Sequence, residues 1–340
     1  MTRVCCGRSR SLCGASEPAC QRTTAGHGPI LGFLDLQVQF WAAILGRMQL
    51  GTFGVWQPSF LTTVVMAREI EEIGFSTLWI GGESPDLAHA GELLAATDKL
   101  IIGTSIVNIW NGAPTTVAEA YLRIADRYPD RFILGLGVGH REQNEPYAKP
   151  MTALNRYLDV LDRRGVPVGG RALAALGPRM LDLARQRSGG VVPYLVTPEH
   201  TRRTRATLGQ GLLVAPEQKG VVDSQAERAR ALARRRIKHP YLGLVNYTNN
   251  LRRLGFTDDD LAGDGSDQLI DRLAVHGDAQ TVARGLRKHL DAGADHVQIQ
   301  VIGSHHAPHP RVRDVDLQVY DQEVFDTYRS LATALNLTPA

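Results

Sequence analysis

The stretch Arg131–His140, RFILGLGVGH, decides the fold of this chain. Its apolar run, 132–134, is typical of a buried strand, and Gly135, Gly137 and Gly139 then alternate up to the histidine. Glycine allows a ligand or another backbone to come close and adopts backbone angles that other residues resist. Taken alone, the stretch predicts a core strand that ends in a tight turn.

Strand-like and helix-like segments alternate on both sides of this stretch. Besides the opening stretch, strands are expected at 49–55, 77–80, 100–107, 171–175, 191–195, 211–215 and 295–301. Eight strand–helix units in order predict an α/β fold with a parallel sheet closed into a (β/α)8 TIM barrel. The long segment 216–293, with at least two helical pieces at 224–237 and 278–292, is expected to form a helical insertion after strand seven. A doubly wound open sheet is the alternative, but its nucleotide fingerprint needs glycines after the first strand, where this chain reads Trp56-Gln57-Pro58.

Residues 1–47 differ from the rest of the chain in composition. They hold all four cysteines and five arginines against two acidic residues, which accounts for the whole net charge of +3. We expect 1–47 to be a disordered extension or a mis-called start, and 48–340 to be one barrel domain. The neutral, cysteine-free body argues against nucleic acid as a partner and excludes a cysteine nucleophile or disulfide framework there. With no apolar run of spanning length, we expect a soluble cytoplasmic protein that does not bind membranes.

Active sites of such barrels lie at the carboxyl ends of the strands, which selects a few candidate residues. His140 and Glu83 are candidates for proton transfer, although each is equally interpretable as a surface residue. Trp56 and Trp110 are candidate apolar walls of a substrate pocket, with core or rim packing as the alternative.

The turn around Gly177 is a candidate phosphate site. Leu176-Gly177-Pro178-Arg179 opens a predicted helix, whose unpaired N–H groups and partial positive charge favour an anion, and Arg179 adds a cation. A plain helix cap explains the same residues. His305, His306 and His309 lack a partner carboxylate at a set spacing, so no metal site is expected.

Several segments, in this order, carry a resemblance to a known family. They are AREIEEIGFSTLWI at 67–80, KLIIGTSIVNIW at 99–110, DRFILGLGVGH at 130–140, LAALGPRMLDLA at 173–184, PYLVTPEHT at 193–201 and GDAQTVARGLRKHLDAGADHVQIQV at 277–301. The chain from 48 to about 301 resembles the bacterial luciferase-like monooxygenase superfamily, specifically its coenzyme F420-dependent oxidoreductase branch.

The resemblance implies a deazaflavin or flavin that lies across the carboxyl ends of the strands, and a homodimer. It implies a non-proline cis peptide at Ser105-Ile106 against the ring, and a turn beside the ring formed by Gly137, Val138, Gly139 and His140. It implies phosphate contacts at Ala175, Leu176, Gly177 and Pro178. Many relatives have an acidic residue and a histidine after strand two, where this chain reads Gly81-Gly82-Glu83.

The expected function is hydride transfer between coenzyme F420 and a small organic substrate. An FMN-dependent monooxygenase is the first alternative, because no residue of the chain separates the two cofactors. A cofactor-binding barrel without turnover is the second, because of the departure at Gly81–Glu83.

Overall fold

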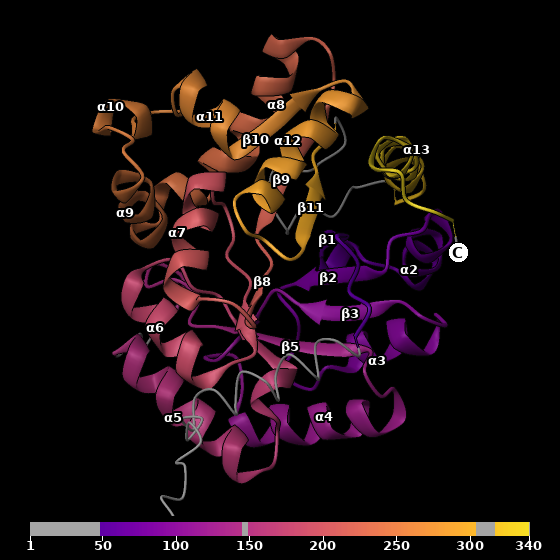
Figure 1. Ribbon diagram of the computed structural model, residues 1–340, viewed down its shortest axis with the longest axis vertical. Coiled ribbons are helices and arrows are strands. Elements are labelled where there is room, and N and C mark those ends of the chain that lie inside the picture. The colour runs from indigo at the N-terminus through magenta and orange to yellow at the C-terminus, as the bar shows by residue number, and fades with distance from the viewer. Residues whose placement is uncertain (1–47, 145–148, 304–316, 340) are drawn as a thin grey trace, which may run out of the picture.

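Parallel strands alternate with helices along the computed structural model, which describes residues 48–144, 149–303 and 317–339 (Figure 1). All the strand pairs are parallel and join into one 11-stranded sheet. The strands are β1 (Phe53–Pro58), β2 (Thr77–Gly81), β3 (Ile101–Thr104), β4 (Val107–Asn108), β5 (Phe132–Gly137), β6 (Arg171–Leu173), β7 (Gly190–Val191), β8 (Leu213–Val214), β9 (Glu217–Val222), β10 (Ala274–Gly277) and β11 (Val297–Val301).

The sheet curls back on itself through β8 and β9. Its order is β10-β9-β11-β1-β2-β3-β5-β6-β7-β8, with β4 paired to β5. Only two residues separate β8 from β9, so the two form one extended segment. This segment pairs through β8 with β7 and through β9 with β10 and β11, which joins the two ends of the sheet order. The Glu217 amide donates to the Pro193 carbonyl beyond β7, and the Gln298 amide of β11 donates to the Pro216 carbonyl, both at 2.9 Å.

Helices cover the outer face of the curled sheet, and α8 to α11 form a separate group beside β9 and β10 (Figure 1). The helices of the described residues are α2 (Val64–Ile73), α3 (Ala88–Ala95), α4 (Pro114–Arg127), α5 (Pro150–Arg163), α6 (Pro178–Arg187), α7 (Pro198–Leu208), α8 (Ala226–Lys238), α9 (Val245–Arg253), α10 (Asp258–Leu261), α11 (Asp267–Leu273), α12 (Ala279–Asp291) and α13 (Leu317–Leu335). Local signals set their ends: in α2, the Thr63 hydroxyl caps the first turn and Gly74, at φ 104°, ends the last.

Side chains alternate between the two faces of the sheet, as a strand requires. Val55, Leu78 and Leu134 belong to the large apolar core between the sheet and the helices. Trp56 and Trp79 belong to a second core, on the inner face. A third core joins α8, α9 and α11 beside β9 and β10.

Two buried histidines, His296 and His289, each form two hydrogen bonds through their ring nitrogens. On the inner face, Trp79 donates its indole N–H to His296 Nε2 at 3.0 Å, and His296 Nδ1 donates to the Gly51 carbonyl at 2.8 Å. Between α7, α12 and β9, His289 Nδ1 contacts the Thr201 hydroxyl at 2.8 Å and Nε2 contacts Gln218 Oε1 at 2.7 Å. These contacts define the neutral tautomer of each ring, because an indole only donates and a carboxamide oxygen only accepts.

Two expectations about the strands are wrong in detail. The first strand begins at Phe53, later than expected, and the third is interrupted, with β3 and β4 on either side of Ser105-Ile106. The segment 216–293 contains the two expected helical pieces, as α8 and α12, and also two strands, since β9 continues the seventh strand and β10 pairs with β9. A strand that runs on past Pro216, with polar residues at Glu217, Gln218 and Lys219, lacks the apolar run that predicts a buried strand.

Candidate functional site

The loop after β5 is held by side chains from neighbouring strand ends. Trp110 donates its indole N–H to the Val138 carbonyl at 2.7 Å, and Asn108 donates to Asn144 Oδ1 at 2.8 Å. Asn144 in turn donates to the His140 carbonyl at 2.7 Å. These bonds tie the loop that carries His140 to the segment that follows β3.

The glycines of β5 make room for the protein's own neighbouring strand. A Cβ on Gly135 would lie 1.8 Å from the Thr104 carbonyl oxygen, and one on Gly137 would lie 2.9 Å from the Ile106 side chain. Gly139 has φ +57°, and a Cβ there would lie 2.7 Å from the Asn108 amide. The first two glycines therefore accommodate the segment Thr104–Ile106, whose Ser105-Ile106 peptide is cis as the resemblance implies.

His140 is half-buried and is held as a proton acceptor. Its Nδ1 lies 3.1 Å from Asn246 Oδ1 on α9, and its ring lies 5.3 Å from that of Tyr247. Because a carboxamide oxygen only accepts, Nδ1 carries the proton and the lone pair lies on Nε2. Burial lowers the pKa of His140, which keeps the ring neutral at pH 7.

Glu83 is buried, so its interpretation as a solvated loop residue is wrong. Ser59 donates its hydroxyl to Glu83 Oε2 at 2.8 Å, and the residue forms a bridge to Val107 of β4. Burial raises the pKa of Glu83 and outweighs the opposing hydrogen bond from Ser59. The structure thus places a buried carboxyl group with a raised pKa after β2, and His140 after β5, on either side of β3.

Gly177 opens α6 and faces a cation from α9. Gly177 is the N-cap residue at φ −98°, and a Cβ built on it would lie 3.5 Å from Arg253 Nη2. Arg253 donates to Asn250 Oδ1 at 3.4 Å, whereas Asn250 Nδ2 is buried without a hydrogen-bond partner among the described residues. We call these three residues the Gly177 cradle. An unpaired donor, a guanidinium and a helix N-terminus together suit an anion.

The residues around the Gly177 cradle have different environments. Ala175 is buried, Leu176 is partly buried, and Pro178 and Arg179 are exposed on the first turn of α6. His200 of α7 donates from Nε2 to the Leu176 carbonyl at 3.0 Å and so fixes the turn from behind. Arg253, not Arg179, is the guanidinium placed over Gly177, and only the general richness in arginine of 216–293 pointed to it.

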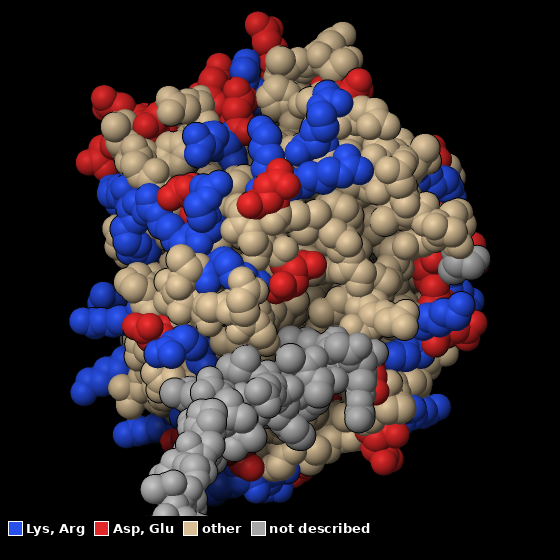
Figure 2. Space-filling model, viewed as in Figure 1, with Lys and Arg blue, Asp and Glu red and all other residues tan. Residues whose placement is uncertain are grey.

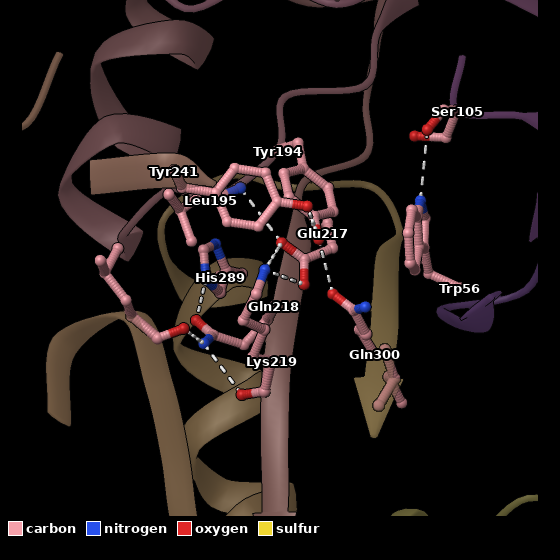
Figure 3. A network of polar contacts seen from close by, with 12 residues as sticks. Trp56, Ser105, Tyr194, Leu195, Glu217, Gln218, Lys219, Tyr241, His289 and Gln300 are labelled. Atoms are coloured by element: carbon pink, nitrogen blue, oxygen red, sulfur yellow. Dashed lines mark hydrogen bonds and ion pairs between the residues drawn. The ribbon is translucent and has the colours of Figure 1, made fainter. Parts of the chain in front are cut away.

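A polar cluster lies on the inner face of the sheet, with residues from the loop after β7, the first half of β9, the end of β11 and the segment after α8 (Figure 3). We call it the inner cluster; it consists of Tyr194, Glu217, Lys219, Tyr241 and Gln300. Lys219 Nζ lies 3.0 and 3.1 Å from the two Glu217 carboxylate oxygens and 4.0 Å from the Tyr194 ring centre. Tyr241 donates to the Tyr194 hydroxyl at 2.9 Å, which donates to Gln300 Oε1 at 2.8 Å.

Sequence reasoning missed the inner cluster, although one signal was present. Glu217 and Lys219 are two residues apart, the spacing that puts both side chains on the same face of a strand. Complete burial lowers the pKa of Lys219 to about 8, against the attraction of Glu217. The pair is neutral as a unit, and it is covered by aromatic rings.

The two candidate tryptophans have different positions. Trp56 is buried on the inner face, 5.2 Å from the Tyr194 ring, and donates to the Ser105 carbonyl at 3.4 Å. Trp110 is partly buried against the outer core, where it supports the His140 loop. Of the two, only Trp56 adjoins the inner cluster.

The described residues hold no group of three or more histidines, cysteines or acids placed to bind a metal ion. His305, His306 and His309 lie outside the described residues. Within the same ranges, none of the helices has the length and apolarity needed to cross a membrane. On the face in Figure 2, basic side chains stand next to acidic ones around a mostly uncharged centre. Arg202 and Arg203, for example, both pair with Glu199.

Comparison with known proteins adds sequence and structural relatives. The model of the luciferase-like monooxygenase family matches residues 44–164. An F420-dependent glucose-6-phosphate dehydrogenase of Nakamurella multipartita is 29% identical over 121 residues, 29% of this chain and 35% of the relative. Another, from Microbacterium testaceum, is 32% identical over 81 residues, 20% of this chain and 24% of the relative. The matches thus span about a quarter to a third of these curated relatives.

The fold has solved counterparts. An F420-dependent secondary alcohol dehydrogenase, solved in complex with an F420-acetone adduct, superposes with a TM-score of 0.62 at 15% identity. The superposition covers 84% of this chain and 98% of that one.

Proposed function

We propose that the chain, whose residues 44–164 match the model of the luciferase-like monooxygenase family, is an oxidoreductase that transfers hydride between coenzyme F420 and a small organic substrate. The matched curated relatives, which are F420-dependent dehydrogenases, support the choice of cofactor. We further propose that residues 48–340 form one (β/α)8 barrel domain in which β8 and β9 make up strand seven. The helices α8 to α11 then form the insertion before strand eight.

The observation that carries the proposal is the Gly177 cradle. A phosphate-bearing cofactor needs an anion site at the carboxyl ends of the strands, and Gly177, Arg253 and the unpaired Asn250 Nδ2 supply one. In this proposal Ala175 to Arg179 hold the phosphate, and Ser105, Ile106 and the turn from Gly137 to Gly139 lie beside the ring. When bound, the deazaflavin supplies a carbon that accepts or donates hydride.

The chain's own residues handle the proton. His140 Nε2 offers a lone pair, because Asn246 fixes the proton on Nδ1. Its lowered pKa keeps it unprotonated near neutral pH, as a base must be. Glu83, whose pKa is raised by burial, is the proposed proton donor in the reverse direction. Trp56 and the buried core below it keep water from the inner face.

Titration with F420 and, separately, with FMN tests this function. Followed by absorbance and fluorescence, F420 should bind and FMN should not. Gly177→Val should weaken F420 binding while the melting temperature stays within about 2 °C, because φ at Gly177 is ordinary and a Cβ there has only Arg253 within 4 Å. Gly91→Ala, whose Cβ meets nothing within 4 Å, is the matched control and should bind normally.

Other outcomes point to the two alternatives. Tight FMN binding without F420 binding would replace the proposal by an FMN-dependent monooxygenase, which the family description favours. F420 binding without oxidation of any alcohol, aldehyde or sugar phosphate would indicate a binding barrel without turnover.

We also propose that the chain forms a homodimer. Phe60, Val64 and Val65 are exposed next to one another at the start of α2, where a second copy would cover them. Light scattering of the purified protein tests this, and a monomer at micromolar concentration would contradict it.

A further inference from the structure

We propose that α7 positions both halves of the Gly177 cradle and so determines how tightly it holds an anion. In this proposal His200 directs the Gly177 amide, and Arg203 holds the end of α9 that carries the guanidinium. The inference rests on the function proposed above only for the identity of the anion, the phosphate of the cofactor. Apart from the helix start, the buried Asn250 Nδ2, which lacks a hydrogen-bond partner among the described residues, indicates a ligand at this place.

The first turn of α6 has two amide groups available to an anion. Pro178, at the first helical position, has no N–H. The Met180 and Leu181 amides both donate to the Gly177 carbonyl at 3.0 Å. The amides of Gly177 and Arg179 donate to no group in the described part of the chain. An anion at this helix start therefore bonds to these two amides, and their direction decides how well it is held.

His200 determines the direction of the Gly177 amide. Its Nε2 donates to the Leu176 carbonyl at 3.0 Å, and the Thr204 hydroxyl donates to its Nδ1 at 3.2 Å, so the neutral ring keeps its proton on Nε2. The Leu176–Gly177 peptide is trans and planar, so its N–H points opposite to its C=O, away from His200. At φ −98° this N–H and the Cβ direction lie on the same side of the N–Cα bond, where Arg253 Nη2 is 3.5 Å from the Cβ position. The bond from His200 thus turns the amide toward the guanidinium.

Arg203 holds the other half of the cradle. It lies three residues after His200, and hence on the same side of α7, which packs against α6 and reaches the end of α9 (Figure 1). Its Nη1 donates to the Arg253 carbonyl at 2.8 Å, and its Nε donates to Glu199 Oε1 at 2.9 Å. The guanidinium of Arg253 in turn donates to Asn250. One helix therefore sets the separation of the amide and the guanidinium that the anion must bridge.

Calorimetric titration with F420 and, separately, with inorganic phosphate tests the role of His200. His200→Met removes the donor and should raise the dissociation constant of both ligands by about 10-fold, as expected when one hydrogen bond to an anion is misdirected. His200→Gln puts an amide donor near the place of Nε2 and should restore most of the affinity. His289→Met is the matched control, because His289 is an equally buried histidine whose ring contacts Thr201 and Gln218 instead. It should lower the melting temperature and leave both dissociation constants unchanged.

The same titrations test Arg203. Arg203→Met should raise both dissociation constants by about 3-fold, because the lost bond to α9 is partly exposed. Arg202→Met is its control, since Arg202 also pairs with Glu199 but, within the described ranges, has no hydrogen bond to α9. Equal affinities in the two arginine variants would overturn the role of Arg203.

The outcomes separate this inference from the proposed function. Binding of phosphate but not of F420, with the same dependence on His200, would support the positioning role and contradict the cofactor. Equal F420 affinity in the wild type and His200→Met would overturn the inference and leave the function standing. Equal losses in His200→Met and His200→Gln, or no binding of either ligand by the wild type, would also overturn it. If His200→Met does not fold, Thr204→Val serves instead, because it removes the bond that keeps the proton on Nε2, and it should weaken binding by about 3-fold.

Discussion

Mild acid should unfold this protein through three buried histidines. Burial lowers the pKa of His200 to about 4, of His289 to about 3 and of His296 to about 4, from an ordinary value of 6.5. Each ring has one nitrogen that accepts a hydrogen bond in the native state, and for His296 the donor is the indole N–H of Trp79, which cannot reverse its role. Protonation of that ring would place two donors face to face.

The size of the effect follows from proton linkage. Below pH 6.5 the three histidines bind protons in the unfolded chain but stay neutral in the folded chain. The free energy of unfolding therefore falls as pH falls from 6.5 toward 4. Each histidine contributes about 1.4 kcal/mol per pH unit in this range, and the three together lose roughly 6 kcal/mol between pH 6.5 and 5. Glu83, with its raised pKa, acts in the opposite direction and offsets part of this loss. The remainder is a large share of a typical stability of about 5–15 kcal/mol.

Urea denaturation at pH 7, 6 and 5, followed by far-ultraviolet circular dichroism, measures this loss. His289→Gln should lower the stability at pH 7, because it disturbs the contacts to Thr201 and Gln218, but should flatten the pH dependence by about one proton. His239→Gln, at an exposed histidine, controls for the loss of a histidine as such. A free energy of unfolding that is constant from pH 7 to 5 would refute the reasoning.

Two further predictions concern the inner face of the sheet. Gly135→Ala should lower the melting temperature by about 10 °C or more, because its Cβ would lie 1.8 Å from a backbone carbonyl oxygen that cannot shift without strain. The control Gly91→Ala should leave the melting temperature unchanged or slightly raised. An unchanged melting temperature in Gly135→Ala would contradict the packing described for β5. Glu217→Gln should cost about 3–5 kcal/mol in urea unfolding because it leaves Lys219 buried without its counter-ion, and the double variant Glu217→Gln/Lys219→Met should recover most of that loss; additive losses in the double variant would show that the two side chains do not act as a pair.

Local patterns made part of this protein predictable. Short stretches of sequence predict the alternation of strands and helices and the helix that begins after Gly177. The family resemblance predicts the cis peptide at Ser105-Ile106. The burial of Glu83 did not follow, because its partner Ser59 comes from another strand end. The burial of Glu83 depends on which strand ends lie next to it in the sheet, and the residues around Glu83 in the sequence do not determine that.

The residues of the inner cluster and Arg253 were the least predictable. Lys219 lies on β9, Gln300 on β11 and Tyr194 in the loop after β7, and Arg253 lies on α9 in the long segment before strand eight. The spacing of Glu217 and Lys219 was the one local signal among them, and it does not show which residues from other elements lie opposite the pair. Their environments depend on contacts between residues far apart in the sequence, such as the hydrogen bond from Tyr194 to Gln300, which are 106 residues apart. In contrast, the glycines that the sequence made conspicuous, Gly135 and Gly137, make room for the neighbouring segment Thr104–Ile106 of the same chain.

The closure of the sheet also has a consequence for how the protein is made. The segment of β8 and β9 bonds on one side to β7 and on the other to β11, and β11 bonds to β1. During synthesis, everything before Val297 is therefore a sheet with open edges at β1 and β9, which could pair with another chain. Ribosome-bound chains that stop short of β11 should engage chaperones and aggregate when released, and release should become harmless once this strand has emerged.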